Sequence, residues 1–327
     1  MQQRRLGSTG RSVSAIGLGT WQLGADWGDV SESDARAVLE ASADAGVTLF
    51  DTADVYGDGR SEQIIGRFLA DRPGHSITVA TKMGRRVAQE PANYTPENFR
   101  AWTDRSRRNL GVDTLDLVQL HCPPSEVIDA DATYDALDDL VAAGAIAAYG
   151  VSVETVAQAL SAISRPGLTN VQIILNPFRL KPLDEVLPAA ADANVAIFAR
   201  VPLASGLLSG KYSSATRFAD NDHRSYNRHG EAFDKGETFS GVDYETGLRA
   251  VDELETALPD GLSLPAATLA WIASRPGVTS VIPGASNVAQ AVSNASAGEA
   301  DVDLSGFDAA VHDVYDRLLK ADIHPQW

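Results

Sequence analysis

The sequence predicts an α/β fold, a closed (β/α)₈ (TIM) barrel with an N-terminal β-hairpin and extra C-terminal helices. Short apolar runs of strand length alternate with segments of helical periodicity along most of the 327 residues. Strands that alternate with helices form parallel sheets, and we count eight such units after the opening hairpin. Eight units over this length favour a closed barrel over an open, doubly wound sheet. We therefore expect a single domain over residues 1–327.

The first elements are marked by turn and capping signals. Residues 4–13 have the pattern of a short hairpin with a glycine-containing turn, and a first strand is expected at residues 15–20. Ser31 is placed to cap a helix that runs to Ala45 and is ended by Gly46. Thr95 is placed to cap a helix that begins at Pro96 and runs to Leu110. Further strands are expected at 47–50, 77–82, 115–121, 145–151, 171–175 and 195–199, separated by helices at 62–70, 96–110, 132–143, 154–163 and 183–193.

The last third of the chain is less regular. Residues 201–241 show no sustained periodicity, so we expect a long irregular segment there. Two helices are predicted after it, at residues 244–258 and 265–274. The last strand is expected at 279–282, a helix at 287–297 and an extra terminal helix at 307–320.

Composition excludes several classes of protein. No run approaches ~18 uninterrupted apolar residues, and the first residues lack the apolar segment of a secretory signal. The one cysteine, Cys122, cannot form an internal disulfide and fits a reducing cytosol, so a cytoplasmic location is expected. The net charge of −17 argues against a nucleic acid or an anionic membrane as partner. The codon bias of a GC-rich genome is an equally good explanation of the acidic composition.

Two glycine-containing stretches resemble nucleotide-binding motifs but fail their rules. Residues 17–22 (GLGTWQ) carry Gln22 where the dinucleotide fingerprint needs its third glycine. Residues 206–211 (GLLSGK) have one residue too few between the glycines of a phosphate loop, and Tyr212 replaces the required Ser or Thr. We therefore expect neither a Rossmann fold nor a P-loop.

Three predicted strands end in reactive side chains. In the stretch 49–57 (LFDTADVYG), an apolar run is followed by Asp51 and then by Tyr56. The strand at 77–82 ends at Lys82, and the strand at 115–121 ends at His121. The carboxyl ends of barrel strands share one face, so these four side chains are expected to converge.

The four residue types suit proton transfer to a carbonyl oxygen as hydride reaches its carbon. Tyr56 is a weak acid, with an ordinary pKa of about 10, and a nearby ammonium at Lys82 is expected to lower it. Asp51 can hold Lys82 protonated, and His121 can hydrogen-bond a substrate oxygen or pass on a proton. Each residue also has a structural alternative: a buried Asp51–Lys82 ion pair, a packed Tyr56, or a core histidine.

Metal catalysis is the chemical rival, because many barrels use it. Of the six histidines, only His121 lies at a predicted strand end, so no metal site is expected. Cys122, next to His121, is better explained as a packed thiol than as a nucleophile.

Together with these four strand-end residues, the rest of the sequence resembles the aldo-keto reductase superfamily over essentially the whole length of the chain. The resemblance is carried by residues 6–7 (LG), 17–21 (GLGTW), 50–57 (FDTADVYG), 81–82 (TK), 116–121 (DLVQLH), 150–152 (GVS), Gln172, Asn176, 202–212 (PLASGLLSGKY) and 282–287 (IPGASN). It implies a barrel closed at the bottom by a hairpin and a nicotinamide cofactor bound in extended form without a Rossmann fold.

The resemblance also implies roles for individual positions. Tyr56 would be the acid, supported by Asp51, Lys82 and His121. Ser152 and Gln172 would hold the carboxamide, and Arg200 would stack on the nicotinamide. The other implied cofactor residues are Thr20 and Trp21, then Pro202, Leu203, Gly206 and Lys211 at the pyrophosphate, and Gly284, Ser286, Gln290 and Asn294 at the adenosine end. The N-terminus of the last barrel helix would favour anions there.

Three departures from the family pattern affect the cofactor. Arg200 stands where many relatives carry an aromatic ring, and its charge is expected to disfavour the oxidised cofactor. Val153 replaces an asparagine, which removes one carboxamide contact. The adenosine end lacks the usual Lys or Arg, so NADP(H), the expected cofactor, needs Arg217 or Arg224 from the long segment; otherwise NAD(H) becomes competitive.

The expected substrate pocket contains Trp21, Trp27 and Tyr56, an aromatic and partly apolar set that suits aldehydes and ketones. The favoured function is therefore NAD(P)H-dependent reduction of small carbonyl compounds. A regulatory subunit that senses cofactor is the alternative, because residues 284–294 also resemble potassium-channel β subunits. A metal-dependent hydrolase is a third possibility. It predicts that chelation abolishes activity, and we expect no such loss. The oligomeric state stays open.

Overall fold

The barrel is built from eight parallel strands that follow one another in chain order. In the computed structural model, which describes residues 1–24 and 30–327, each strand of the sheet pairs with its neighbours in the sequence, in the order β3 to β10. The strands are β3 (Leu18–Gly19), β4 (Leu49–Asp51), β5 (Thr78–Met83), β6 (Leu117–His121), β7 (Tyr149–Ser152), β8 (Asn170–Ile174), β9 (Ala196–Arg200) and β10 (Val278–Val281). Parallel bridges Ile16–Val281 and Gly19–Gly284 join the two ends, so the sheet closes. The predicted fold class is confirmed.

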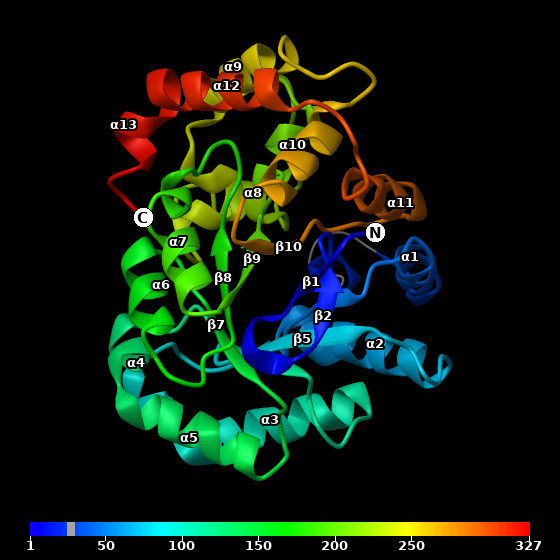
Figure 1. The fold of residues 1–327 in the computed structure, drawn as a ribbon, viewed down its shortest axis with the longest axis vertical. Coiled ribbons are helices and arrows are strands. Elements are labelled where there is room, and N and C mark those ends of the chain that lie inside the picture. Colours follow the sequence, from blue (N-terminus) through cyan, green and yellow to red (C-terminus); the bar gives the residue numbers. More distant parts are fainter. Residues whose placement is uncertain (25–29) are drawn as a thin grey trace.

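Helices surround the strands, as Figure 1 shows. Those of the first half are α1 (Glu32–Asp44), α2 (Arg60–Ala70), α3 (Pro96–Leu110), α4 (Ser125–Asp129), α5 (Asp131–Ala142), α6 (Val156–Ile163) and α7 (Val186–Asp192). The second half contributes α8 (His223–Tyr226), α9 (Tyr244–Glu255), α10 (Leu264–Ala273), α11 (Val288–Ala297), α12 (Ser305–Val314) and α13 (Lys320–Ile323). Helices α9 and α12 pack together at one end of the molecule (Figure 1).

Capping residues fix several helix starts where the sequence predicts them. The Ser31 side chain accepts a hydrogen bond from the Asp34 backbone N–H, and Thr95 accepts one from Asn98. Each bond satisfies a donor that the first helical turn leaves without a partner.

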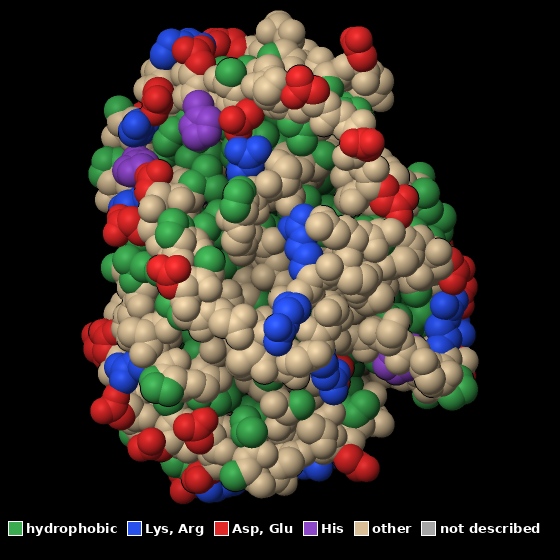
Figure 2. All heavy atoms as spheres, in the orientation of Figure 1, with side chains coloured by type: hydrophobic (Ala, Val, Ile, Leu, Met, Phe, Trp, Pro, Cys, Tyr) green, Lys and Arg blue, Asp and Glu red, His purple; other side chains and the backbone are tan. Residues whose placement is uncertain are grey.

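The N-terminal hairpin closes the bottom of the barrel. Strands β1 (Gln3–Arg5) and β2 (Ser12–Ser14) pair in antiparallel fashion, and Figure 1 shows them across the front of the barrel. Leu6 and Val13 of this hairpin pack with inward-facing strand residues such as Leu49, Ala80 and Leu117 in one apolar cluster. Figure 2 views this face: basic side chains lie near its centre and acidic ones around its edge.

Several predicted boundaries are wrong, most of them by a few residues. The first strand is only Leu18–Gly19, and the strand expected at 145–151 begins at Tyr149. The terminal helix expected at 307–320 is ordinary α-helix only to Val314, followed by a π-helical turn over Tyr315–Leu319. The short helices α4 and α8 were not predicted, because one turn of helix carries almost no periodic signal.

Among the described residues, none of the helices combines the length and the apolar character that crossing a membrane requires.

Candidate active site

A cavity of about 800 Å³ opens at the carboxyl ends of the barrel strands. Its wall includes Asp51, Tyr56 and His121. All fourteen residues expected to bind cofactor also line it: Thr20, Trp21, Ser152, Gln172, Arg200, Pro202, Leu203, Gly206, Lys211, Arg224, Gly284, Ser286, Gln290 and Asn294. Trp27, expected in the substrate pocket, lies outside the described residues.

The structure brings the four predicted reactive side chains together. Lys82 Nζ donates to Asp51 Oδ2 at 2.7 Å and to the Tyr56 hydroxyl at 3.4 Å. A third bond, to the Thr52 carbonyl at 2.8 Å, completes the donor capacity of the ammonium. The His121 and Tyr56 ring centroids lie 6.0 Å apart in an edge-to-face arrangement.

Strand alternation explains why these groups point inward. In β4, Leu49 packs inside the barrel and Phe50 packs outward against Phe68 of α2, so Asp51 faces inward again. Lys82 sits two residues after Ala80, and His121 four residues after Leu117, on the inward faces of β5 and β6.

Tyr56 is placed by a tight turn rather than by a strand. It opens the one-turn helix Tyr56–Gly59, in which Gly57 has φ +58°. A Cβ on Gly57 would lie 2.1 Å from the Gly24 carbonyl oxygen, so only glycine fits this close approach. Trp21 stacks on Tyr56, with the two ring centroids 6.1 Å apart.

Burial controls the protonation states of the site. Desolvation lowers the pKa of Lys82, whereas the Asp51 carboxylate raises it. The net shift of the pKa is upward, so the amine stays charged. Burial raises the pKa of the Tyr56 phenol more than the Lys82 charge lowers it. The expected lowering of the Tyr56 pKa is therefore wrong for this state of the site. Burial and the Arg85 and Lys82 charges hold the pKa of His121 well below its ordinary value, so its imidazole is neutral.

A chain of buried amides supports Asp51 from inside the barrel. Gln172 Nε2 donates to Asp51 Oδ1 at 2.8 Å and to Gln119 Oε1 at 3.1 Å. Gln119 in turn donates to the Asn170 side chain, which donates to the Ala196 carbonyl. Gln172, expected at the carboxamide, thus also orients the carboxylate. Gln119 and Asn170 were not predicted, because one polar residue within an apolar run does not reveal which neighbours it faces.

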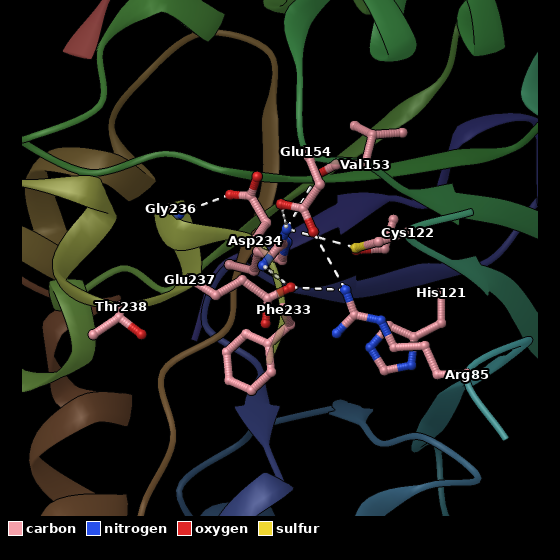
Figure 3. A network of polar contacts seen from close by, with 12 residues as sticks. Arg85, His121, Cys122, Val153, Glu154, Phe233, Asp234, Gly236, Glu237 and Thr238 are labelled. Carbon is pink, nitrogen blue, oxygen red and sulfur yellow. Dashed lines mark hydrogen bonds and ion pairs between the residues drawn. The ribbon is translucent and has the colours of Figure 1, made fainter. Parts of the chain in front are cut away.

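Arg200 lies in a buried network of ion pairs. Figure 3 shows Arg85, Glu154 and Glu237 of this network. Its guanidinium contacts Glu154 Oε2 at 2.7 Å and Glu237 Oε1 at 3.6 Å, and Arg85 bridges the same two carboxylates at 3.3 and 2.9 Å. Two carboxylates thus face the two guanidinium groups, so the positive charge of Arg200 is compensated within the network. The expectation that this charge disfavours the oxidised cofactor stays a prediction.

Cys122 completes this cluster. Its thiol, Glu154 and Glu237 offer metal-ligand atoms within 4.8 Å of one another. Burial raises the pKa of Cys122 to about 12, so the thiol is protonated, and both carboxylates already pair with arginines. The cluster has the character of an ion-pair network rather than of a metal site.

The opposite end of the cavity carries polar but uncharged groups. Gln290 Oε1 accepts bonds from the Ser286 backbone N–H at 2.8 Å and from its hydroxyl at 3.0 Å, and Asn294 Nδ2 donates to the Gly284 carbonyl at 3.1 Å. Asn287 caps α11 through a bond from the Gln290 N–H. This end therefore presents a capped helix N-terminus to the cavity.

The two candidate cations of the long segment are placed differently. Arg224 lines the cavity, but it pairs with Asp222 and contacts the Tyr212 hydroxyl. Arg217 is not among the lining residues and donates to the Ser214 and Thr216 carbonyls. Of the two, only Arg224 reaches the cavity wall, which also includes the exposed Lys211.

Residues 201–241 cover the cavity in an unusual backbone conformation. Val201, Ala204, Ser205, Phe239 and Ser240 all have positive φ between 46° and 58°. Such angles are rare for residues other than glycine, above all for β-branched valine, and strain of this kind is typical of functional sites.

Sequence reasoning missed three contributors from this segment. His223 and Phe233 lie against Trp21, with ring centroids at 5.0 and 6.3 Å, and Glu237 lines the cavity and anchors the ion network. The segment lacks periodicity, so no sequence signal indicates which of its side chains turn inward.

Several buried polar atoms on the cavity wall fit a polar ligand. Within the described part of the chain, Gln22 Oε1, His121 Nδ1 and Arg200 Nε have no hydrogen-bond partner. Buried polar groups are normally satisfied, so these atoms favour a ligand that can hydrogen-bond along the cavity. A nicotinamide dinucleotide has that character.

Comparison with known proteins agrees with this architecture. The family model described as "Aldo/keto reductase family" matches residues 15–309. The chain is 30% identical to a glycerol dehydrogenase of Gluconobacter oxydans, whose solved structure superposes with a TM-score of 0.80 over 99% of this chain and 98% of that one. It is 29% identical to an NADP(+) aldo-keto reductase of Schizosaccharomyces pombe, covering 98% of this chain and 92% of the relative. It is also 29% identical to a probable voltage-gated potassium channel subunit beta of Oryza sativa, covering 91% of each.

Proposed function

Because this chain belongs to the aldo/keto reductase family, and is therefore an oxidoreductase, we propose that it reduces aldehydes and ketones to alcohols with NADP(H). One observation carries the proposal. The buried Lys82 ammonium lies between the Asp51 carboxylate at 2.7 Å and the Tyr56 hydroxyl at 3.4 Å, close to the neutral imidazole of His121. Asp51, Tyr56 and His121 line a large cavity.

Each residue has a role in proton transfer. A bound nicotinamide supplies hydride to the carbonyl carbon. The Tyr56 hydroxyl donates its proton to the carbonyl oxygen, so that carbonyl, hydride and proton together give the alcohol. Lys82 stabilises the phenolate that remains, and Asp51 keeps Lys82 charged and in place. Neutral His121 donates a hydrogen bond to the same substrate oxygen. In the reverse direction the phenolate accepts the proton of an alcohol.

The cofactor residues divide between the two ends of the cavity. Ser152, Gln172 and Arg200 would hold the nicotinamide end. Residues 202–206 and Lys211 would hold the pyrophosphate, and residues 284–294 the adenosine end, where the N-terminus of α11 favours an anion. Lys211 and Arg224 are the cations on the wall that can reach a 2′-phosphate, and the named NADP(+) specificity of the yeast relative supports NADP(H). NAD(H) is the alternative if neither cation engages.

The test joins a binding measurement to a substrate panel. NADPH and NADH are titrated against the protein by fluorescence quenching, and turnover of aromatic and aliphatic aldehydes and ketones is then followed with the preferred cofactor. We expect tighter binding of NADPH than of NADH and measurable turnover of at least one simple aldehyde. Absence of binding by either cofactor would contradict the proposal. Tight binding without turnover across the panel would favour a cofactor-sensing role like that suggested by the channel-subunit relative.

A further inference from the structure

The ion network beside the nicotinamide end is assembled from segments far apart in the chain. Arg85 follows β5, Glu154 follows β7, Arg200 ends β9, and Glu237 comes from the irregular segment 201–241. Figure 3 shows Arg85, Glu154 and Glu237 pointing toward one another. Arg200 Nη2 also donates to the Val153 carbonyl at 3.2 Å. Residues 153–154 and Glu237 thus hold the Arg200 guanidinium directly, and Arg85 contacts the same two carboxylates.

Burial makes the charge balance of this network important. Arg200 is 9% exposed, and the side chains of Glu154 and Glu237 are 14% and 10% exposed. At this depth an unpaired charge acts on its neighbours with little screening by water. Two guanidinium groups against two carboxylates leave the network close to neutral when both carboxylates are ionised.

We propose that Glu154 and Glu237 are positioning residues that hold Arg200 at the nicotinamide end of the cavity and cancel its charge, so that oxidised and reduced cofactor are both accepted there. The inference rests on the proposed function, since it needs a nicotinamide cofactor. Arg200 lines the same cavity as Ser152 and Gln172, the pair assigned to the carboxamide. Arg200 Nη2 is paired with Glu154, whereas the buried Nε of Arg200 has no hydrogen-bond partner among the described residues.

The consequence follows from the charge of the cofactor. The nicotinamide ring is positively charged when oxidised and neutral when reduced. A guanidinium without its carboxylates would repel only the oxidised ring, so loss of either glutamate charge should separate the two affinities. The 2′-phosphate and the adenosine are common to both forms, and their contributions cancel in the ratio of the two dissociation constants.

The experiment measures that ratio in Glu154→Gln, which keeps the shape of the side chain and removes its charge. Dissociation constants for NADP⁺ and NADPH are determined at about pH 8, because burial raises the pKa of Glu154 to about 7 and its charge is needed in the wild type. We expect the ratio of the NADP⁺ constant to the NADPH constant to rise about tenfold over the wild type. Glu126→Gln, an exposed glutamate on α4, is the matched control and should leave the ratio unchanged.

A second variant keeps the inference testable if Glu154→Gln does not fold. Glu237→Gln removes the carboxylate supplied by the irregular segment and should raise the ratio in the same direction. Unchanged ratios in the glutamine variants that fold, with both cofactor forms still bound, would overturn the inference and leave the proposed function intact. Absence of binding of both forms by the wild-type protein would instead overturn the proposed function itself.

A pH series on the wild type gives an independent readout. Glu154 faces Arg200, Arg85, Glu237, Asp234 and the protonated Cys122. As the pH falls through about 7, Glu154 takes up a proton and the network becomes more positive. The affinity ratio should therefore rise from about pH 8 to about pH 6 in the wild type and stay flat in Glu154→Gln. A flat wild-type profile would count against the compensating role of Glu154.

Discussion

At the scale of single residues, strand alternation sets where each side chain of the site points, and burial sets its protonation state. The alternation of strand residues places Asp51 inward after Leu49, and the ends of the next two strands deliver Lys82 and His121 to the same face. The direction of the Tyr56 pKa shift was wrong, because desolvation depends on what the fold packs around the phenol. The partners of Arg200 were not predictable for the same reason: Glu154 and Glu237 are distant in sequence.

Asp54 is a buried carboxylate with an uncommon environment. Its side chain is fully buried, and neither oxygen has a hydrogen-bond partner among the described residues. Burial, together with the nearby Glu62 carboxylate, raises the pKa of Asp54 to about 7. The folded protein therefore holds a proton that the unfolded chain releases above about pH 4. The resulting stability is present at low pH and is lost as the pH rises through about 7.

Replacing this carboxylate gives the first prediction. The side chain introduced by Asp54→Asn cannot ionise, so the variant avoids the loss of stability that the wild type suffers as the pH rises. The difference in free energy of unfolding between variant and wild type should therefore shift by about 2 kcal/mol in favour of the variant from about pH 5.5 to about pH 8. Urea unfolding at the two pH values measures the difference. Asp301→Asn, an exposed substitution, is the control and should show no such gain. If the Asp54→Asn difference is the same at both pH values, the carboxyl group is not held protonated by the fold.

At the scale of elements, helices with caps were predictable and the irregular segment was not. Ser31 and Thr95 cap the helices that they were expected to cap, because the capping bond is local in sequence. Residues 201–241 owe their course to tertiary contacts. Asn176 Nδ2 donates to Ser240 Oγ at 2.7 Å, and Ser205 Oγ donates to the Glu237 carbonyl at 2.9 Å. No pattern within the segment carries that information.

Trp327 fastens part of this segment to the barrel. Its indole Nε1 donates to Asp234 at 3.0 Å, and the Arg179 guanidinium lies 3.8 Å above its ring. A Cβ at Gly241 would lie 2.4 Å from the same ring, so the backbone there packs directly on it. Asp234 is three residues from Glu237, and the contact therefore also supports the ion network.

Removing the indole should loosen the segment without unfolding the barrel. Trp327→Ala is expected to increase the cofactor dissociation rate by about tenfold and to expose residues 211–241 to limited proteolysis. The reason is that local opening of the segment then costs less free energy. Stopped-flow fluorescence and protease digestion measure the two effects. Gln326→Ala changes the exposed neighbour and should do neither. Equal dissociation rates and digestion patterns for Trp327→Ala and the wild type would rule out this fastening role.

At the scale of the whole molecule, the closed barrel explains how one cavity collects residues from all parts of the chain. Eight strand ends meet at one mouth, while the hairpin residues Leu6 and Val13 fill the other end. The count of strand–helix units was enough to predict this architecture. The acidic surface was also evident from composition, with 44 acidic residues against 27 basic ones.

The net charge of −17 leads to a prediction about salt. Self-repulsion of the acidic surface opposes compaction, and added salt screens it. Raising NaCl from about 0.02 to 0.5 M should therefore increase stability by on the order of 1 kcal/mol, which corresponds to a Tm increase of a few degrees. Differential scanning calorimetry at a fixed pH measures this. A Tm that falls with salt would mean that the surface ion pairs outweigh the repulsion between acidic groups.

The proton-transfer role of Tyr56 is the central claim, and one substitution tests it most directly. Tyr56→Phe keeps the ring that stacks on Trp21 and removes only the hydroxyl that Lys82 contacts. With an aldehyde that the wild type reduces, kcat should fall by about 10²–10⁴-fold while the NADPH dissociation constant stays within about twofold. Tyr134→Phe, which removes a hydroxyl away from the cavity, should retain wild-type kcat. A Tyr56→Phe protein that turns over at the wild-type rate would contradict the account.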